Sequence, residues 1–97
     1  MNRSTGSGGG DIKDVVKKFI IDNYLLGSRK VQIKDTDSFL EKGIIDSIGI
    51  IELTSFLQRQ YAVNIRPVEI VPENCDSLQN IERFITKKLD SKSNGKK

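Results

Sequence analysis

The sequence predicts an all-α fold: a small four-helix bundle of three longer helices and one short helix, with a long loop between helices 1 and 2. Apolar residues recur at helical spacing in three separate segments, which indicates three amphipathic helices. Only one short stretch of the chain alternates like a strand, and it has no partner strand. Three apolar stripes of this kind are buried by packing against one another.

Both ends of the chain are too polar to join this core. Residues 1–10 are rich in glycine and serine and predict a disordered linker or a tag remnant. Residues 91–97 predict a disordered polar tail. The folded domain is therefore expected to span residues 11–90.

The first helix is expected at about residues 12–26. Asp11 precedes it as a candidate N-cap, and Gly27 follows it as a candidate stop signal. The apolar positions expected to face the core are Ile12, Val15, Val16, Phe19, Ile20 and Leu25 or Leu26.

Residues 28–46 form a long connection, a length that is usually functional or packed by its own side chains. We expect Phe39 and Leu40 to reach from this loop into the core. Gly43 predicts a bend with positive φ that directs Ile44 and Ile45 inward.

The second helix is expected at about residues 47–61, with Asp46 as its N-cap. Ser47 then lies in the first turn, where the helix dipole favours a negative group by roughly 0.3–1 kcal/mol. A phosphate attached to this hydroxyl would lie beside free backbone amides, so the position suits an attachment point. Gly49 is expected to leave space beside Ser47. Leu53, Phe56, Leu57 and Tyr61 are expected to face inward.

The remaining elements are a short helical turn and a last helix. Pro67 suits the first position of a turn at about residues 67–71. Asp76 and Gln79 match a capping box that opens a helix at about residues 77–89. Lys87 and Lys88 are expected to interact favourably with the negative, C-terminal end of that helix's dipole.

The charge is distributed unevenly. Four of the sixteen Lys and Arg residues lie in the tails, whereas all thirteen Asp and Glu lie in residues 11–90, which leaves this core with a net charge of −1. A nucleic-acid partner is therefore not expected for the core. The chain has no apolar run long enough to span a membrane and no secretory signal.

The chain lacks the side chains that several kinds of functional site require. The chain has no histidine and one cysteine, Cys75, which excludes Ser-His-Asp and Cys-His catalysis, a zinc site with nitrogen and sulfur ligands, and an internal disulfide. Asp35 and Asp37 are not followed by the glycine and glutamate of a calcium loop. We expect the protein to catalyse no reaction and to bind no metal. Cys75 is expected to be a small buried or half-buried apolar residue. The expected location is a reducing compartment, the cytoplasm.

The segment 43–57, Gly-Ile-Ile-Asp-Ser-Ile-Gly-Ile-Ile-Glu-Leu-Thr-Ser-Phe-Leu, resembles the signature of acyl carrier proteins. In that family, Asp-Ser followed by Leu or Ile opens the second of four helices. The likeness covers about residues 11–89. It implies that a phosphopantetheinyl transferase attaches 4′-phosphopantetheine from coenzyme A to Ser47, and that acyl groups are then carried as thioesters for acyl-loading and acyl-processing enzymes.

The same resemblance implies roles for the neighbours of Ser47. Asp46 helps the transferase to recognise the site. The positions that match contacts with partner enzymes are Ile48, Ile51, Glu52 and Ser55.

The sequence also departs from the family pattern. Carriers of fatty-acid synthesis usually have a strongly acidic second helix, whereas Glu52 is almost alone here. This favours a stand-alone carrier with specialised partners, in fatty-acid-like, polyketide or other biosynthesis. We also expect the carrier to be a monomer. An aminoacyl or peptidyl carrier is one alternative, although Ile44-Ile45 replaces the Gly-Gly pair common in that branch. A small helical module that binds nucleic acid or protein, with Asp46-Ser47 as a plain helix cap, is the alternative from another class.

Overall fold

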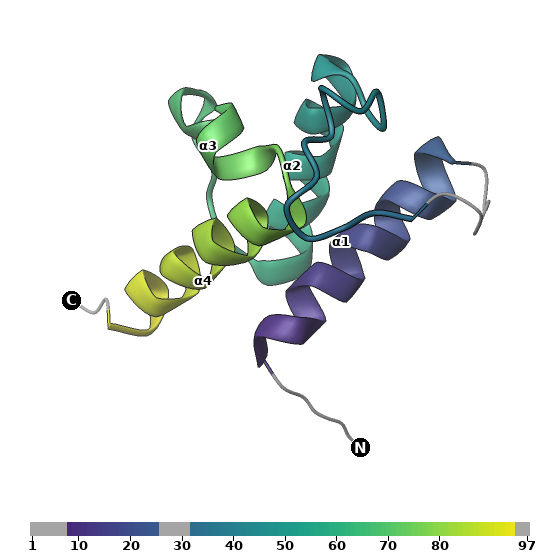
Figure 1. Cartoon of the computed structure of the whole chain (residues 1–97). Coiled ribbons are helices and arrows are strands. Elements are labelled where there is room, and N and C mark those ends of the chain that lie inside the picture. Colours follow the sequence, from purple (N-terminus) through teal and green to yellow (C-terminus); the bar gives the residue numbers. More distant parts are fainter. Residues whose placement is uncertain (1–7, 26–31, 95–97) are drawn as a thin grey trace.

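The computed structural model describes residues 8–25 and 32–94, and these residues form the helical bundle that the sequence predicts (Figure 1). No β-strand occurs in these two ranges. The elements are α1 (Gly8–Tyr24), α2 (Ser47–Tyr61), the 3-10 turn η2 (Pro67–Glu69), α3 (Pro72–Cys75) and α4 (Leu78–Asn94). Among the described helices, none is long and apolar enough to cross a membrane.

The core lies where the apolar faces of α1, α2 and α4 meet, with the short α3 packed on α4. As expected from its spacing, α1 buries Ile12, Val16 and Ile20, while Phe19 is only partly buried. The loop adds Phe39, which is completely buried. The expectation for Leu40 was wrong, because this side chain remains 39% exposed. Other residues buried from the later helices are Leu53, Leu57, Cys75, Leu78, Ile81 and Ile85.

Two helices differ in length from the expectation. Helix α1 begins at Gly8, so Asp11 lies inside it and is not the N-cap. Glycine is unfavourable in a helix by about 1 kcal/mol but does not forbid the conformation. Helix α4 continues to Asn94, five residues past the expected end. The expected stop at Gly27, together with Leu26, lies outside the described residues.

The predicted capping box at the start of α4 was wrong. Ser77 takes the capping role, since its hydroxyl accepts the backbone N–H of Asn80 at 3.1 Å. Asp76 instead binds the long loop: its carboxylate accepts the backbone N–H of Leu40 at 3.0 Å and the hydroxyl of Ser38. A contact distant in sequence therefore decides which of two adjacent capping residues caps the helix.

Backbone hydrogen bonds fasten the same loop to the α3–α4 junction. The N–H of Phe39 donates to the carbonyl of Asp76 at 2.9 Å, and the N–H of Gln79 donates to the carbonyl of Asp35 at 3.0 Å. The described part of the long connection has no regular structure but is held to the α3–α4 junction at Asp35 and at Phe39.

The expected short turn becomes two separate elements. Pro67 opens η2 and Pro72 opens α3, so each proline occupies the first position that suits it. The expected dipole role of Lys88 was wrong, because α4 continues past it. The Lys88 ammonium pairs with the Glu69 carboxylate at 2.7 Å, which ties η2 to α4.

Candidate functional site

The start of α2 is fixed by one side chain. Asp46 has an extended backbone, and its carboxylate accepts the N–H of Gly49 at 2.8 Å. Its carbonyl accepts the N–H of Ile50 at 2.9 Å, which is the first bond of the helix. The N-cap predicted for Asp46 and the helix start predicted at Ser47 are both confirmed.

Ser47 is exposed at this helix tip, and so are Asp46 before it and Ile48 after it. Ile45, two residues before Ser47, and Ile50, three residues after it, are only 4% and 7% exposed. The chain is therefore anchored in the core on both sides of Ser47. The N–H groups of the first turn have no intrahelical acceptor, which gives the tip a partial positive charge. The Ser47 hydroxyl is thus accessible, held in place, and suited to carrying an anionic group.

The loop before Asp46 turns as the sequence predicts. Gly43 has φ of +68°, in the left-handed region that glycine tolerates best. The N–H of Ile44 donates to the carbonyl of Phe39 at 2.8 Å, which closes the bend. After the bend, Ile45 is buried in the core, whereas Asp46 and Ser47 are exposed to solvent.

A groove of about 250 Å³ opens beside Ser47, between α2 and the segment that leads into α3. Its lining is mostly apolar: Leu40, Ile50, Ile51, Ile70, Val71, Pro72 and Cys75, with Ser47 and Asp76 as the polar members. Burial raises the pKa of the Cys75 thiol to about 11, so Cys75 behaves as the small buried residue that was expected.

Two apolar side chains of α2 are also exposed to solvent. Ile48 is 63% exposed and Ile51 is 51% exposed, although both are large and apolar. Glu52 is exposed on the same helix, and Ser55 is half-buried. The four positions that the family resemblance singled out follow one face of α2 at helical spacing.

Gly49 does not leave free space beside Ser47, contrary to the expectation. It is buried, and a Cβ atom there would lie 3.1 Å from Cβ of Ile45 and 3.3 Å from the Tyr24 ring. The missing side chain allows α1 and α2 to approach each other closely.

Sequence reasoning missed the part that Tyr24 plays. Its hydroxyl donates a hydrogen bond to the Glu52 carboxylate, across 28 positions of sequence. Burial, together with this bond, raises the pKa of Tyr24 to about 12. The nearly lone acidic side chain of α2 is thereby held by α1, a contact that no local pattern signals.

A helical bundle that presents one accessible hydroxyl at a helix tip, beside an apolar groove, is arranged to carry an attached group. In agreement with this, the family model described as "Phosphopantetheine attachment site" matches residues 25–85, well over half of the chain. The chain belongs to this family. No curated protein sequence matches it.

The family match confirms the resemblance to carrier proteins and 4′-phosphopantetheine as the covalent group. The residues of the α2 tip fit such a group. Ser47 would supply an exposed oxygen, the first-turn amides would favour a phosphate attached there, and the apolar groove opens directly beside it.

Proposed function

We propose that Ser47 is the attachment residue and that the protein is a non-catalytic acyl carrier, which holds acyl intermediates for partner enzymes. The observation that carries this proposal is the exposed Ser47 hydroxyl at the tip of α2, on a segment that Ile45 and Ile50 anchor in the core. When attached, phosphopantetheine supplies a terminal thiol that forms the thioester. The protein itself supplies the oxygen, its fixed position and a docking surface.

Asp46 has two roles in this account. As the N-cap, it fixes where α2 begins and so where the Ser47 oxygen stands. As an exposed carboxylate next to that oxygen, it is the contact by which we expect the transferase to recognise the site.

The docking surface is proposed to comprise Ile48, Ile51, Glu52 and Ser55. The exposure of two large isoleucines supports this, because apolar patches in solvent commonly mark interaction sites. Leu40 and Val71, exposed by 39% and 36%, border the same groove and extend the patch.

Acyl cargo is favoured over aminoacyl cargo by the groove lining. An alkyl chain gains free energy by leaving water for such a lining, whereas a charged amino group does not. An aminoacyl or peptidyl carrier is the second candidate.

The partners are proposed to be specialised enzymes of fatty-acid-like, polyketide or similar biosynthesis. Across Ser47–Tyr61, Glu52 is the only acidic residue and Arg59 the only basic one, so α2 is neutral. Basic patches on a partner would gain little steering from this helix. We also infer that the carrier is a cytoplasmic monomer whose domain is residues 11–90.

Intact mass after incubation with coenzyme A and a broad-specificity phosphopantetheinyl transferase tests the assignment. The wild type should gain the mass of one phosphopantetheine, and Ser47→Ala should gain none. Ser91→Ala, which removes an exposed hydroxyl on α4, is the matched control and should behave like the wild type. No gain by the wild type, or a gain by Ser47→Ala, rejects the proposal.

A further inference from the structure

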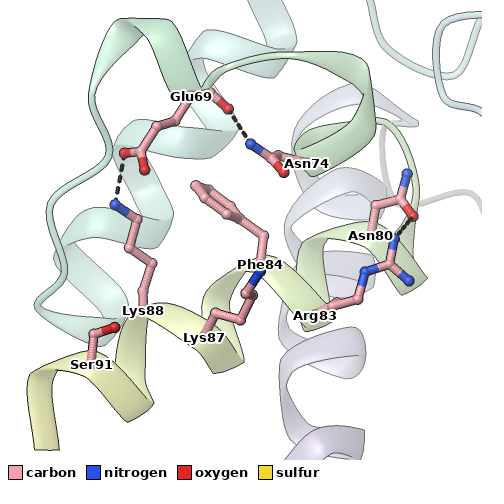
Figure 2. Close-up of a pocket in the computed structure, with 8 residues that line it drawn as sticks. All are labelled: Glu69, Asn74, Asn80, Arg83, Phe84, Lys87, Lys88 and Ser91. Carbon is pink, nitrogen blue, oxygen red and sulfur yellow. Dashed lines mark hydrogen bonds and ion pairs between the residues drawn. The ribbon is translucent and has the colours of Figure 1, made fainter. Parts of the chain in front are cut away.

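A second hollow, of about 340 Å³, lies between α4 and two residues of the preceding elements, Glu69 of η2 and Asn74 of α3 (Figure 2). It shares no lining residue with the groove beside Ser47. Its lining residues are Glu69, Asn74, Asn80, Arg83, Phe84, Lys87, Lys88 and Ser91.

The hollow holds more positive than negative side chains. Arg83, Lys87 and Lys88 come from α4, whereas Glu69 is the only acid in the lining. Glu69 is already shared: it pairs with Lys88 at 2.7 Å and with Arg66 at 3.9 Å. The hydrogen bond from Lys88 holds the pKa of Glu69 below its usual value, so this carboxylate stays charged near neutral pH.

The other two cations have no anion of their own. The Arg83 guanidinium donates to the neutral side-chain oxygen of Asn80 at 2.9 Å. Lys87 forms no ion pair with any residue in the described ranges. Asp90 follows on the same helix but is not part of the lining, and it too forms no ion pair within those ranges. Two positive charges in the lining of the hollow are therefore available to a ligand.

The walls are fixed before any ligand arrives. The Asn74 amide donates to the carbonyl of Glu69 at 2.9 Å, and the Asn80 amide donates to the carbonyl of Pro72 at 3.3 Å. The Phe84 ring, only 9% exposed, stands at the centre, with the Lys88 ammonium 5.5 Å from the ring centroid. Figure 2 shows this ring between α4 and the Glu69–Asn74 wall.

We propose that this basic hollow is a second docking surface, which binds an acidic segment of a partner protein through Arg83 and Lys87. The ion pair of Lys88 with Glu69 shows that one cation of the hollow already binds a carboxylate. A planar guanidinium and an ammonium on the same helix suit side-chain carboxylates supplied by a peptide. The hollow and the groove beside Ser47 share no lining residue, so the proposed docking surface is separate from that groove.

A nucleic acid fits less well. A phosphate backbone requires a long basic stripe, whereas the basic residues here are confined to one face of α4. On another side of that helix, Glu82 lies 3.6 Å from Lys13 and brings negative charge.

The test is an NMR titration of isotope-labelled full-length Ser47→Ala protein with a hexaglutamate peptide. Using Ser47→Ala keeps this test independent of the attachment site. At low salt we expect saturable shifts in residues 69–74 and 80–91, which weaken as salt rises. The double variant Arg83→Gln/Lys87→Gln should bind the peptide at least about tenfold more weakly.

The matched control is Lys42→Gln/Arg59→Gln, which removes the same charge from exposed positions outside the hollow. It should retain the wild-type affinity. An equal loss in this control, shifts centred elsewhere, or no shifts would overturn the proposal. So would equally tight binding of inorganic phosphate, which would indicate a small-anion site, or tighter binding of a single-stranded oligonucleotide.

Discussion

At the residue scale, the position of the Ser47 oxygen depends on Asp46. Its carboxylate satisfies one of the free N–H groups of α2 and so decides which residue begins the helix. If the cap were lost, the first turn could fray and Ser47 would no longer have a fixed place.

Replacing Asp46 with alanine should lower the free energy of unfolding by about 1 kcal/mol, because the Gly49 N–H loses its acceptor. Urea unfolding measures this. Asp46→Asn keeps a capping oxygen and should stay close to the wild type in stability. Equal losses for both variants would mean that the cap does not set the stability of this tip.

A second residue-scale prediction concerns the bond between Tyr24 and Glu52. Tyr24→Phe keeps the ring that packs on Gly49 but removes the hydroxyl, and should cost about 1 kcal/mol. A double-mutant cycle with Glu52→Gln should give a coupling energy of about 0.5–1.5 kcal/mol. Additive effects of the two substitutions would show that the two helices are not coupled through this bond.

At the element scale, the long loop is held by Asp76. This carboxylate accepts from Ser38 and from the N–H of Leu40, and the Asp76 carbonyl accepts from Phe39. The loop ends directly at Asp46, so its anchoring helps to hold the start of α2.

Replacing Asp76 with alanine should destabilise the protein by about 1–3 kcal/mol, because two donors lose their acceptor. Amide hydrogen exchange at Leu40 should quicken more than exchange at Leu53 in α2. Ser38→Ala removes only one of the two bonds and should have a smaller effect. Unchanged exchange at Leu40 would contradict the anchoring role.

Elements set by neighbouring residues could be predicted from the sequence. The bounds of α2, the cap at Asp46 and the bend at Gly43 all depend on contacts within a few positions, and all were predicted correctly. The second helix is also amphipathic enough to be recognised without its partners.

Three of the errors arise where a distant contact matters more than a local one. Asp76 and Ser77 can both cap a helix, and only the folded loop selects Ser77. Gly49 gives no sign that a tyrosine 25 positions earlier fills its surroundings. From the sequence, Lys88 looks like a cation near the C-terminal end of the helix dipole. In the structure the helix continues past Lys88, and its ammonium pairs with Glu69 instead.

At the scale of the whole molecule, burial of Cys75 makes the folded protein less stable at alkaline pH. The folded thiol has a pKa of about 11, against an ordinary value of 9.0, so the native state retains its proton longer than the unfolded state. Unfolding is then favoured as pH rises from about 9 towards about 11. Tyr24, with its pKa raised from 10.0 to about 12, adds to the same trend at higher pH.

Urea unfolding at about pH 8 and about pH 10.5 should show a loss of stability to which Cys75 contributes roughly 2 kcal/mol. Cys75→Ala should lose less between the two pH values, whatever its stability at pH 8. An identical loss in wild type and variant would show that the thiol titrates normally in the folded protein.

The whole molecule also presents two different surfaces. The tip of α2 combines a hydroxyl with exposed apolar side chains on a neutral helix, whereas one face of α4 is basic. This difference suits the proposed carrier, in which one partner would act at Ser47 and another would bind the basic face of α4.

The most direct measurement of the central claim is to locate the attached group by fragmentation mass spectrometry. After incubation with coenzyme A and a transferase, trypsin should release the peptide from Gly43 to Arg59, which contains Ser47, Thr54 and Ser55. We expect this peptide to carry all of the added phosphopantetheine and fragmentation to place it on Ser47. Its presence on any other residue, or an unmodified peptide, would contradict the account.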